Sequence, residues 1–243
     1  MNLPAVIQAY PYLFSGLLGL GAVLLIAARL PLSDHRRLIL RLGLLMTVNF
    51  PFAVFSEADY WAPARMGGWK LGIEDALCAF DIGALAPLPA VLVWRSRLLL
   101  AERPVPRIGR LISLAAATHG CFGLLLLLGW PSMTSLIVMQ LVPVVPLLLW
   151  RRNLWQFAAA GGIGSLMLHC GIVKVCFWIW PAFASCWRSA PPWGQLWFGI
   201  PLGEMVWAAS FGLFWSLLAG FVFDLRLVAT ARTPDACAAT SGP

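Results

Sequence analysis

Ionisable side chains inside apolar stretches are the residues of this chain most suited to chemistry. In a bilayer such a group costs about 3 kcal/mol or more unless it is paired or hydrated, so each one is a candidate for a functional site. Two of the acids are adjacent at the start of one apolar stretch, and another opens the last stretch. The candidates, in chain order, are Glu74, Asp75, Asp81, His169, Lys174 and Glu204.

Each charged candidate also has a structural interpretation. Glu74 and Asp75 fall in the first turn of an expected helix, where carboxylates favour the positive end of the helix dipole and act as caps. Asp81 and Lys174 both lie about 10 Å below the same membrane boundary, given the rise of an α-helix. The two could therefore form an ion pair that holds two helices together.

No pattern in the chain is typical of a bound metal or nucleotide. The single histidines His119 and His169 are expected to be hydrogen-bonded core residues, and the six cysteines form no CxxC pair and no zinc-like spacing. The cysteines are therefore expected to be free thiols. The small-residue stretch Ala158–Ser165 lacks the context of a phosphate-binding loop and is expected to let two helices pack closely. We expect no metal and no cofactor.

The membrane supplies the surroundings of these residues. Hydrophobic residues make up 60% of the chain and charged residues 11%, whereas soluble domains carry about 25% charged residues. Seven apolar stretches are each long enough to cross a hydrocarbon core of about 30 Å. The sequence therefore predicts an all-α, polytopic membrane bundle of about seven transmembrane helices. The expected spans are 12–30, 38–55, 71–94, 111–129, 134–150, 157–181 and 198–223.

The basic residues indicate how the bundle is oriented. Because Lys and Arg are retained in the cytoplasm, we expect an outside N-terminus, a cytoplasmic C-terminus and a bacterial-type inner or plasma membrane. The short basic clusters are typical of topology signals and not of a nucleic-acid surface. Expected outside are Arg65, Lys70 and Arg188, and expected inside are thirteen arginines: Arg29, Arg36, Arg37, Arg41, Arg95, Arg97, Arg103, Arg107, Arg110, Arg151, Arg152, Arg226 and Arg232.

The two halves of the chain show weak internal similarity. A shift of 129 positions lays Leu71–Ala76 on Ile200–Met205, and both segments open a helix at the outer surface. We infer a parallel repeat of three helices joined by a linker helix, with chance similarity as the alternative. The expected parts are a first repeat (1–94), a basic loop with the linker helix (95–133), a second repeat (134–223) and a disordered cytoplasmic tail (224–243).

These repeated segments resemble a known family. Tyr60–Pro63, Gly72–Phe80 and Gly199–Glu204 are similar to the membrane-embedded, non-flavin lycopene cyclase domain of bacteria, archaea and fungi. That family repeats a Pro-x-Glu-Glu-like motif at a helix start. Three positions depart from the motif: Gly72 replaces the proline and Asp75 the second acid in the first copy, and Gly203 replaces the first acid in the second copy.

The resemblance implies a cofactor-free isomerase that cyclises the end groups of a linear carotenoid in the membrane. A protonated carboxyl would deliver a proton to a terminal alkene, and a neighbouring carboxylate would stabilise the cation and accept the departing proton. The first repeat would supply the proton. The implied partners are membrane lipid and a hydrophobic polyene, without nucleic acid, and a homo- or hetero-oligomer is compatible. The implied catalytic residues are Glu74, Asp75 and Glu204. Asp81, Lys174 and His169, as ionisable groups within the expected spans, are the candidates for a supporting role.

Three other functions stay open. Lys174 with Asp81 as its counter-ion would suit a seven-helix retinal protein, but the last stretch lacks the lysine that microbial rhodopsins carry there. The second is a small transporter whose acids form a proton relay. The third is a catalytically silent relative that binds lipid or another membrane enzyme.

Overall fold

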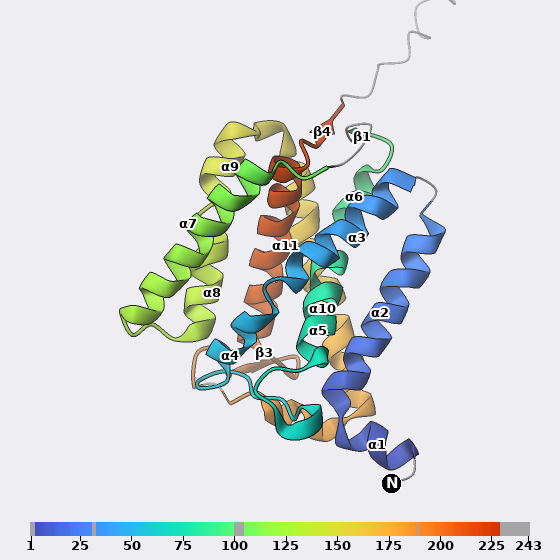
Figure 1. Ribbon diagram of the computed structural model, residues 1–243, viewed down its shortest axis with the longest axis vertical. Coiled ribbons are helices and arrows are strands. Elements are labelled where there is room, and N and C mark those ends of the chain that lie inside the picture. Colours follow the sequence, from blue (N-terminus) through green and yellow to red (C-terminus); the bar gives the residue numbers. More distant parts are fainter. Residues whose placement is uncertain (1–2, 31–32, 100–104, 189, 229–243) are drawn as a thin grey trace, which may run out of the picture.

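Helices that run back and forth between two ends of the molecule make up most of the chain (Figure 1). The computed structural model describes residues 3–30, 33–99, 105–188 and 190–228. Within these residues six helical segments are long and apolar enough to cross a membrane, and the bent pair Ser33–Thr47 and Phe50–Ser56, counted as one span, makes a seventh. The predicted all-α bundle of about seven transmembrane helices is confirmed, and the chain is an integral membrane protein.

The spans follow the expected apolar stretches. The first three spans are α2 (Pro11–Arg29), then α3 (Ser33–Thr47) continued by η1 (Phe50–Phe52) and α4 (Ala53–Ser56), then α5 (Ile73–Leu85) continued by α6 (Leu88–Trp94). The last four are α7 (Ile108–Leu127), α8 (Ser132–Leu141) continued by α9 (Val144–Trp150), α10 (Trp155–Ile179) and α11 (Leu202–Val222). The shorter elements are α1 (Leu3–Ala9), η2 (Met66–Gly68), β1 (Leu98–Leu99), η3 (Arg152–Leu154), η4 (Pro181–Cys186), β2 (Leu196–Trp197), β3 (Ile200–Pro201) and β4 (Arg226–Leu227).

Prolines account for the breaks inside three of the spans. A proline lacks the backbone donor and its ring clashes with the preceding helical turn, so a helix ends or bends there. Pro51 lies where the second span bends by 45°. Pro87 lies between α5 and α6, and Pro143 lies between α8 and α9.

The two ends of the bundle carry different charges. α5 and α11 begin at the end where the N-terminus lies (Figure 1). This end is termed the acid end, because Asp75 and Glu204 lie in the first turns of these helices. The opposite end is termed the arginine end. Of the thirteen arginines expected on one side, Arg103 and Arg232 lie outside the described residues, and the others lie at the arginine end or within the first three turns of helices that leave it.

Small residues let α10 and α11 pack closely, as the stretch Ala158–Ser165 predicts. A Cβ atom on Gly212 would overlap the carbonyl oxygen of Gly161 on the facing helix. α11 also reaches α5, because the Trp215 Nε1–H donates to the Gly83 carbonyl oxygen at 2.9 Å. These contacts fix the two acid-bearing helices, α5 and α11, relative to each other.

The chain stays ordered past the end of α11. The sequence predicts a disordered tail from residue 224, but β4 pairs with β1 in an antiparallel ladder that joins Leu98 to Leu227. The Arg107 backbone N–H also donates to the Val222 carbonyl oxygen at 2.9 Å. The prediction of disorder is therefore wrong for residues 225–228, whose backbone groups have partners, and residues 229–243 of the predicted tail lie outside the described residues.

Candidate functional site

Two loops close the acid end over the starts of α5 and α11. One loop connects α4 to α5, and the other connects α10 to α11. Trp61 of the first loop forms a β-bridge with Trp187 of the second, and the Arg188 N–H donates to the Tyr60 carbonyl oxygen at 2.8 Å. Loops from the two halves of the chain are thus joined, and both supply side chains that bind the acids beneath them.

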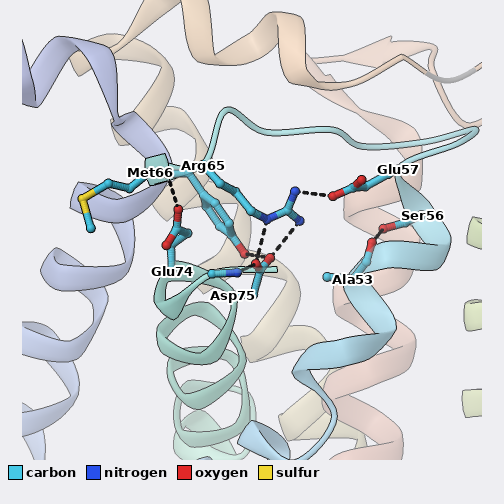
Figure 2. A network of polar contacts seen from close by, with 9 residues as sticks. Ala53, Ser56, Glu57, Arg65, Met66, Glu74 and Asp75 are labelled. Carbon is cyan, nitrogen blue, oxygen red and sulfur yellow. Dashed lines mark hydrogen bonds and ion pairs between the residues drawn. The ribbon is translucent and has the colours of Figure 1, made fainter. Parts of the chain in front are cut away.

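Asp75 lies in the first turn of α5 and accepts hydrogen bonds from four donors. The Arg65 guanidinium donates to both carboxylate oxygens, from Nε at 2.7 Å and from Nη2 at 2.9 Å (Figure 2). The Tyr12 hydroxyl donates at 3.1 Å and the Gly72 backbone N–H at 2.8 Å. The bond from Gly72 is the one by which an acid at the third helical position caps the start of its helix. The predicted capping role of Asp75 is confirmed.

Arg65 is a buried cation held between two acids. It forms an ion pair with Glu57 as well as with Asp75, and only 8% of it is exposed. Burial alone would lower the pKa of its guanidinium, but the hydrogen bonds and charges of Asp75 and Glu57 outweigh burial and raise this pKa. Arg65 therefore stays charged. The sequence held a signal for it, because Arg65 is one of only three basic residues expected at this end.

Glu74, the neighbour of Asp75, points to the other side of the first turn (Figure 2). Its Oε1 accepts the Met66 backbone N–H at 2.7 Å, and its carboxyl group lies against Gly72. The side chain is buried, at 1% exposure, and it does not line the cavity that Asp75 faces. Glu74 therefore anchors the loop before α5, apart from the other predicted catalytic residues.

Glu204 lies in the first turn of α11 and has three side-chain partners. The Tyr60 hydroxyl and the Trp187 Nε1–H each donate to Oε1 at 2.8 Å. His169 Nε2 shares a hydrogen bond of 2.7 Å with Oε2. Burial, and then the negative charge of Glu204, raise the pKa of Tyr60 far above its usual value, so Tyr60 stays a hydroxyl donor. The prediction that His169 is a hydrogen-bonded core residue is confirmed.

Asp75 and Glu204 face one cavity of about 610 Å³. This volume lies in the range of small-molecule sites, and most of the lining is apolar or aromatic. The cavity reaches the lipid-facing surface at Val48, which lines it and is 75% exposed. Its titratable lining residues are Tyr12, Tyr60, Asp75, Cys78, Asp81, His119, His169, Cys176 and Glu204.

Asp81 lies nearly two turns beyond Asp75 on α5 and lines the same cavity. The residue is 6% exposed, and its Oδ1 has no hydrogen-bond partner among the described residues. Gly19 of α2 makes room for the carboxyl group, because a Cβ atom there would overlap it. An acid with an unpartnered buried oxygen is unusual in a folded protein and is a candidate for function.

Lys174 lies away from the cavity, on an exposed face of α10. Among the described residues no ion pair joins Lys174 to Asp81, so the predicted pair is wrong. A Cβ atom on Gly199 would lie 3.0 Å from Lys174 Nζ, so the amine reaches back to the loop at the acid end. This is how long basic side chains near a membrane boundary keep their charge close to water.

The His119 imidazole has a structural role, and the described residues contain no metal site. His119 Nε2 shares a 2.7 Å hydrogen bond with Asn49 Oδ1, as expected for a core histidine. No group of three or more His, Cys, Asp or Glu side chains in the described part of the chain could hold a metal ion. The five described cysteines are free thiols.

The two acids that face the cavity occupy matching positions in the two halves of the chain. The shift of 129 positions lays Asp75 on Glu204 and lays Glu74 on Gly203. Each aligned acid lies in the first turn of its helix, lines the cavity and accepts a hydrogen bond from a tyrosine, Tyr12 or Tyr60. The geometry of the site agrees with the inferred repeat, which stays a prediction for the rest of the chain.

Comparison with protein-family models, with curated proteins and with solved structures finds no match for this chain. The chemistry of the site therefore rests on its own geometry. It comprises two hydrogen-bonded carboxylates and one acid with an unpartnered oxygen, around a largely apolar cavity.

Proposed function

We propose that this chain is a membrane enzyme that isomerises a linear, apolar polyene by acid–base catalysis, as its resemblance to the non-flavin lycopene cyclase domain implies. The observation that carries the proposal is that Asp75 and Glu204, at matching helix starts, line one apolar cavity together with Asp81. An apolar cavity suits a hydrocarbon chain, and carboxyl groups suit a reaction that adds and removes protons.

The proposed reaction is a ring closure at the end of the polyene. A proton added to the terminal C=C bond leaves a carbocation. The π electrons of a nearby double bond in the same chain attack this cation and close a ring. Loss of a proton from the carbon next to the new cation then restores a double bond. The product is an isomer of the substrate, so the reaction consumes no oxidant and no reductant.

Three acids divide the work in this proposal. Asp81 carries the proton to the alkene, because its Oδ1 has no hydrogen-bond partner among the described residues and is free to face the alkene. Asp75, the carboxylate partner of Arg65, stabilises the positive charge that develops in the cavity. Glu204 accepts the departing proton and shares it with His169, its hydrogen-bond partner. Glu74, which lies off the cavity, has no catalytic role in this assignment.

The substrate reaches the cavity sideways from the bilayer in this proposal. Val48 lines the cavity and is largely exposed, and it lies at the break between α3 and η1. Leu111 and Ala115 of α7 also line the cavity, and the hydrogen bond between Asn49 and His119 joins the break to α7. A polyene dissolved among lipid tails would enter here without crossing water.

The arginine end is proposed to face the cytoplasm. Lys and Arg are retained on that side of a membrane, which places the acid end and the N-terminus outside and the C-terminus inside. The membrane would be a bacterial-type inner or plasma membrane. The proposed partners are membrane lipid and the polyene, with no nucleic acid.

Expression in a lycopene-accumulating bacterium, followed by pigment chromatography, tests the proposal. We expect a cyclised carotenoid from the wild-type protein and a loss of about 10²–10⁴-fold from Asp81→Asn, because the amide cannot deliver the proton. The matched control is Asp34→Asn, which removes an acid that lies in an exposed ion pair with Arg37 on α3. Wild-type protein that inserts well yet converts neither lycopene nor another linear carotenoid would overturn the enzymatic proposal.

A further inference from the structure

Four arginines surround one carboxylate at the arginine end. Asp224 forms ion pairs with Arg107 at 3.2 Å, Arg110 at 3.6 Å and Arg226 at 3.8 Å, and with Arg151. Burial would raise the pKa of the Asp224 carboxyl, but the four guanidinium groups outweigh burial and lower this pKa. Among the described residues, four positive charges around one negative charge give the cluster a net charge of +3. Asp224 alone does not neutralise it.

Two of these arginines keep most of their surface available. The side chains of Arg107 and Arg226 are 57% and 65% exposed, while Asp224 is 17% exposed. A guanidinium carries five N–H donors. Among the described residues, Arg107 donates one hydrogen bond to Asp224, from Nη2 at 3.2 Å, and Arg226 approaches Asp224 at 3.8 Å. Their remaining donors can bind the oxygens of a further anion.

An apolar groove of about 330 Å³ begins beside the cluster. α7 forms one wall, and α8 and α9 form the other, with Pro143 at the break between them. No charged residue of the described part of the chain lines the groove. Trp150 and Phe221 belong to the lining, and the Arg110 guanidinium lies over both rings, at 4.7 and 5.3 Å from their centroids. The cluster and the groove therefore meet at these two rings, on which Arg110 packs.

We propose that the cluster and the groove together bind an anionic phospholipid. The phosphate would lie on Arg107, Arg110 and Arg226, and one acyl chain would lie in the groove. The surplus positive charge favours an anion at a membrane surface, and an uncharged groove between transmembrane helices favours a hydrocarbon chain. Trp150, at the junction, suits the boundary between headgroups and acyl chains.

This site is separate from the proposed chemistry, although the two are neighbours. Leu114, Thr118 and Met139 line both the groove and the central cavity, so the groove lies against the cavity wall. Among the described residues, the lining of the groove contains no carboxyl or imidazole group. The groove therefore binds its lipid without converting it.

Native mass spectrometry of the purified protein, with phosphatidylglycerol or phosphatidylcholine added in neutral detergent, tests the proposal. We expect one phosphatidylglycerol to be retained in preference to phosphatidylcholine. The double variant Arg107→Gln/Arg226→Gln should lose affinity for phosphatidylglycerol on the order of tenfold, because basic residues near the headgroup supply the attraction. Ala117→Trp, at an exposed groove position, should weaken the same binding without changing the charge.

The control is Arg36→Gln/Arg37→Gln, which removes the same charge from exposed positions of α3 at the same end. Equal losses from the two double variants would mean diffuse attraction to a basic surface and would overturn the site. Equal retention of the two lipids would also overturn it. Displacement of the lipid by an equal concentration of glycerol 3-phosphate, which has no acyl chain, would overturn the role of the groove. Unchanged thermal unfolding of the variants would exclude misfolding as the cause.

Discussion

Two carboxylates hold corresponding positions in the two halves of the molecule, but their partners differ in chemistry. Asp75 binds the Arg65 guanidinium with both oxygens, whereas Glu204 shares a hydrogen bond with the His169 imidazole. A guanidinium has only N–H donors and keeps its charge, whereas each nitrogen of an imidazole can either donate or accept a hydrogen bond. The same position in the fold can therefore hold a permanent ion pair in one half and a pair able to exchange protons in the other.

The two carboxylates therefore have different roles: the Asp75–Arg65 pair stabilises the site, and the Glu204–His169 pair suits its chemistry. Arg65 comes from the loop before α5 and also binds Glu57 at the end of α4, so the ion pair joins the second span to the third. Glu204 receives donors from both loops of the acid end, yet its third partner lies within the membrane on α10. The first half thus holds the site together, and the second half offers the more adjustable carboxylate.

The largest effect on stability is expected from Arg65→Leu. This change leaves the carboxylates of Asp75 and Glu57 buried without their cation, which costs about 3–5 kcal/mol in the free energy of unfolding. The matched change His169→Leu leaves Glu204 with two donors and should cost about 1–3 kcal/mol. Chemical unfolding in detergent, followed by tryptophan fluorescence, measures both.

Equal losses from Arg65→Leu and His169→Leu would contradict the contrast between the two halves. A control for the ion pair is Asp75→Asn in the Arg65→Leu background. Because the carboxylate no longer has a cation to lose, this second change should cost less than Asp75→Asn does alone. Strict additivity of the two changes would show that the bidentate pair contributes no coupling energy.

Among the acids in the first turns of α5 and α11, Glu204 is the one whose replacement by Gln should reduce catalysis most. The amide keeps the size of the side chain but cannot accept the departing proton, so product formation should fall by about 10²–10⁴-fold. Glu74→Gln is the matched control, since Glu74 is also a buried acid but lies off the cavity. It should leave product formation within about twofold of wild type, because the amide oxygen can still accept the Met66 N–H. Pigment chromatography of strains with matched protein levels compares them.

The opposite ranking would restore the assignment that the family resemblance suggests, in which Glu74 of the first repeat supplies the proton. Loss of product from Glu74→Gln with full activity in Glu204→Gln would give that result. Reduced insertion of either variant is monitored by fluorescence of a fused reporter, which separates folding from chemistry.

The sequence could predict the spans and the acids, because both follow from simple costs. A stretch of about 20 apolar residues has no better solvent than the bilayer, and an acid inside such a stretch is too costly to be incidental. The direction of a side chain is a different matter. Adjacent residues of a helix point about 100° apart, so two neighbouring acids need not face the same cavity, and here Asp75 lines it while Glu74 does not. The alignment of Asp75 with Glu204 already held the answer, since Gly203 falls opposite Glu74.

Other parts of the site depend on contacts that spacing cannot give. Asp81 and Lys174 have similar depths, but depth says nothing about which face of α10 turns inward, and Lys174 turns outward. Arg65 entered the sequence argument only as an exception to the charge distribution. Its partnership with Asp75 depends on how the loop between α4 and α5 folds back over the helix start.

The smallest expected effects come from the two tyrosines that bind the aligned acids. Tyr12→Phe removes a donor from Asp75, which keeps three others, and Tyr60→Phe removes one of three side-chain partners from Glu204. Each loss of a hydrogen bond should cost about 0.5–1.5 kcal/mol in the free energy of unfolding. Only Tyr60→Phe should also slow product formation, because Tyr60 binds Glu204, the proposed proton acceptor, whereas Tyr12 binds Asp75. Similar slowing by both variants would contradict the division of work.

The contact between Tyr60 and Glu204 also predicts how the free energy of unfolding depends on pH. Burial and the charge of Glu204 raise the pKa of Tyr60 above the value of about 10 that tyrosine has in an unfolded chain. The stability that its protonated hydroxyl contributes is complete below about pH 10. It is lost as the pH rises further, because the unfolded chain then releases a proton that the folded chain keeps. Between about pH 10 and pH 11, the free energy of unfolding should therefore fall less steeply in Tyr60→Phe than in wild type. Parallel slopes would mean that Tyr60 ionises as easily in the folded protein as in the unfolded chain, and that Glu204 does not hold a buried, protonated tyrosine beside it.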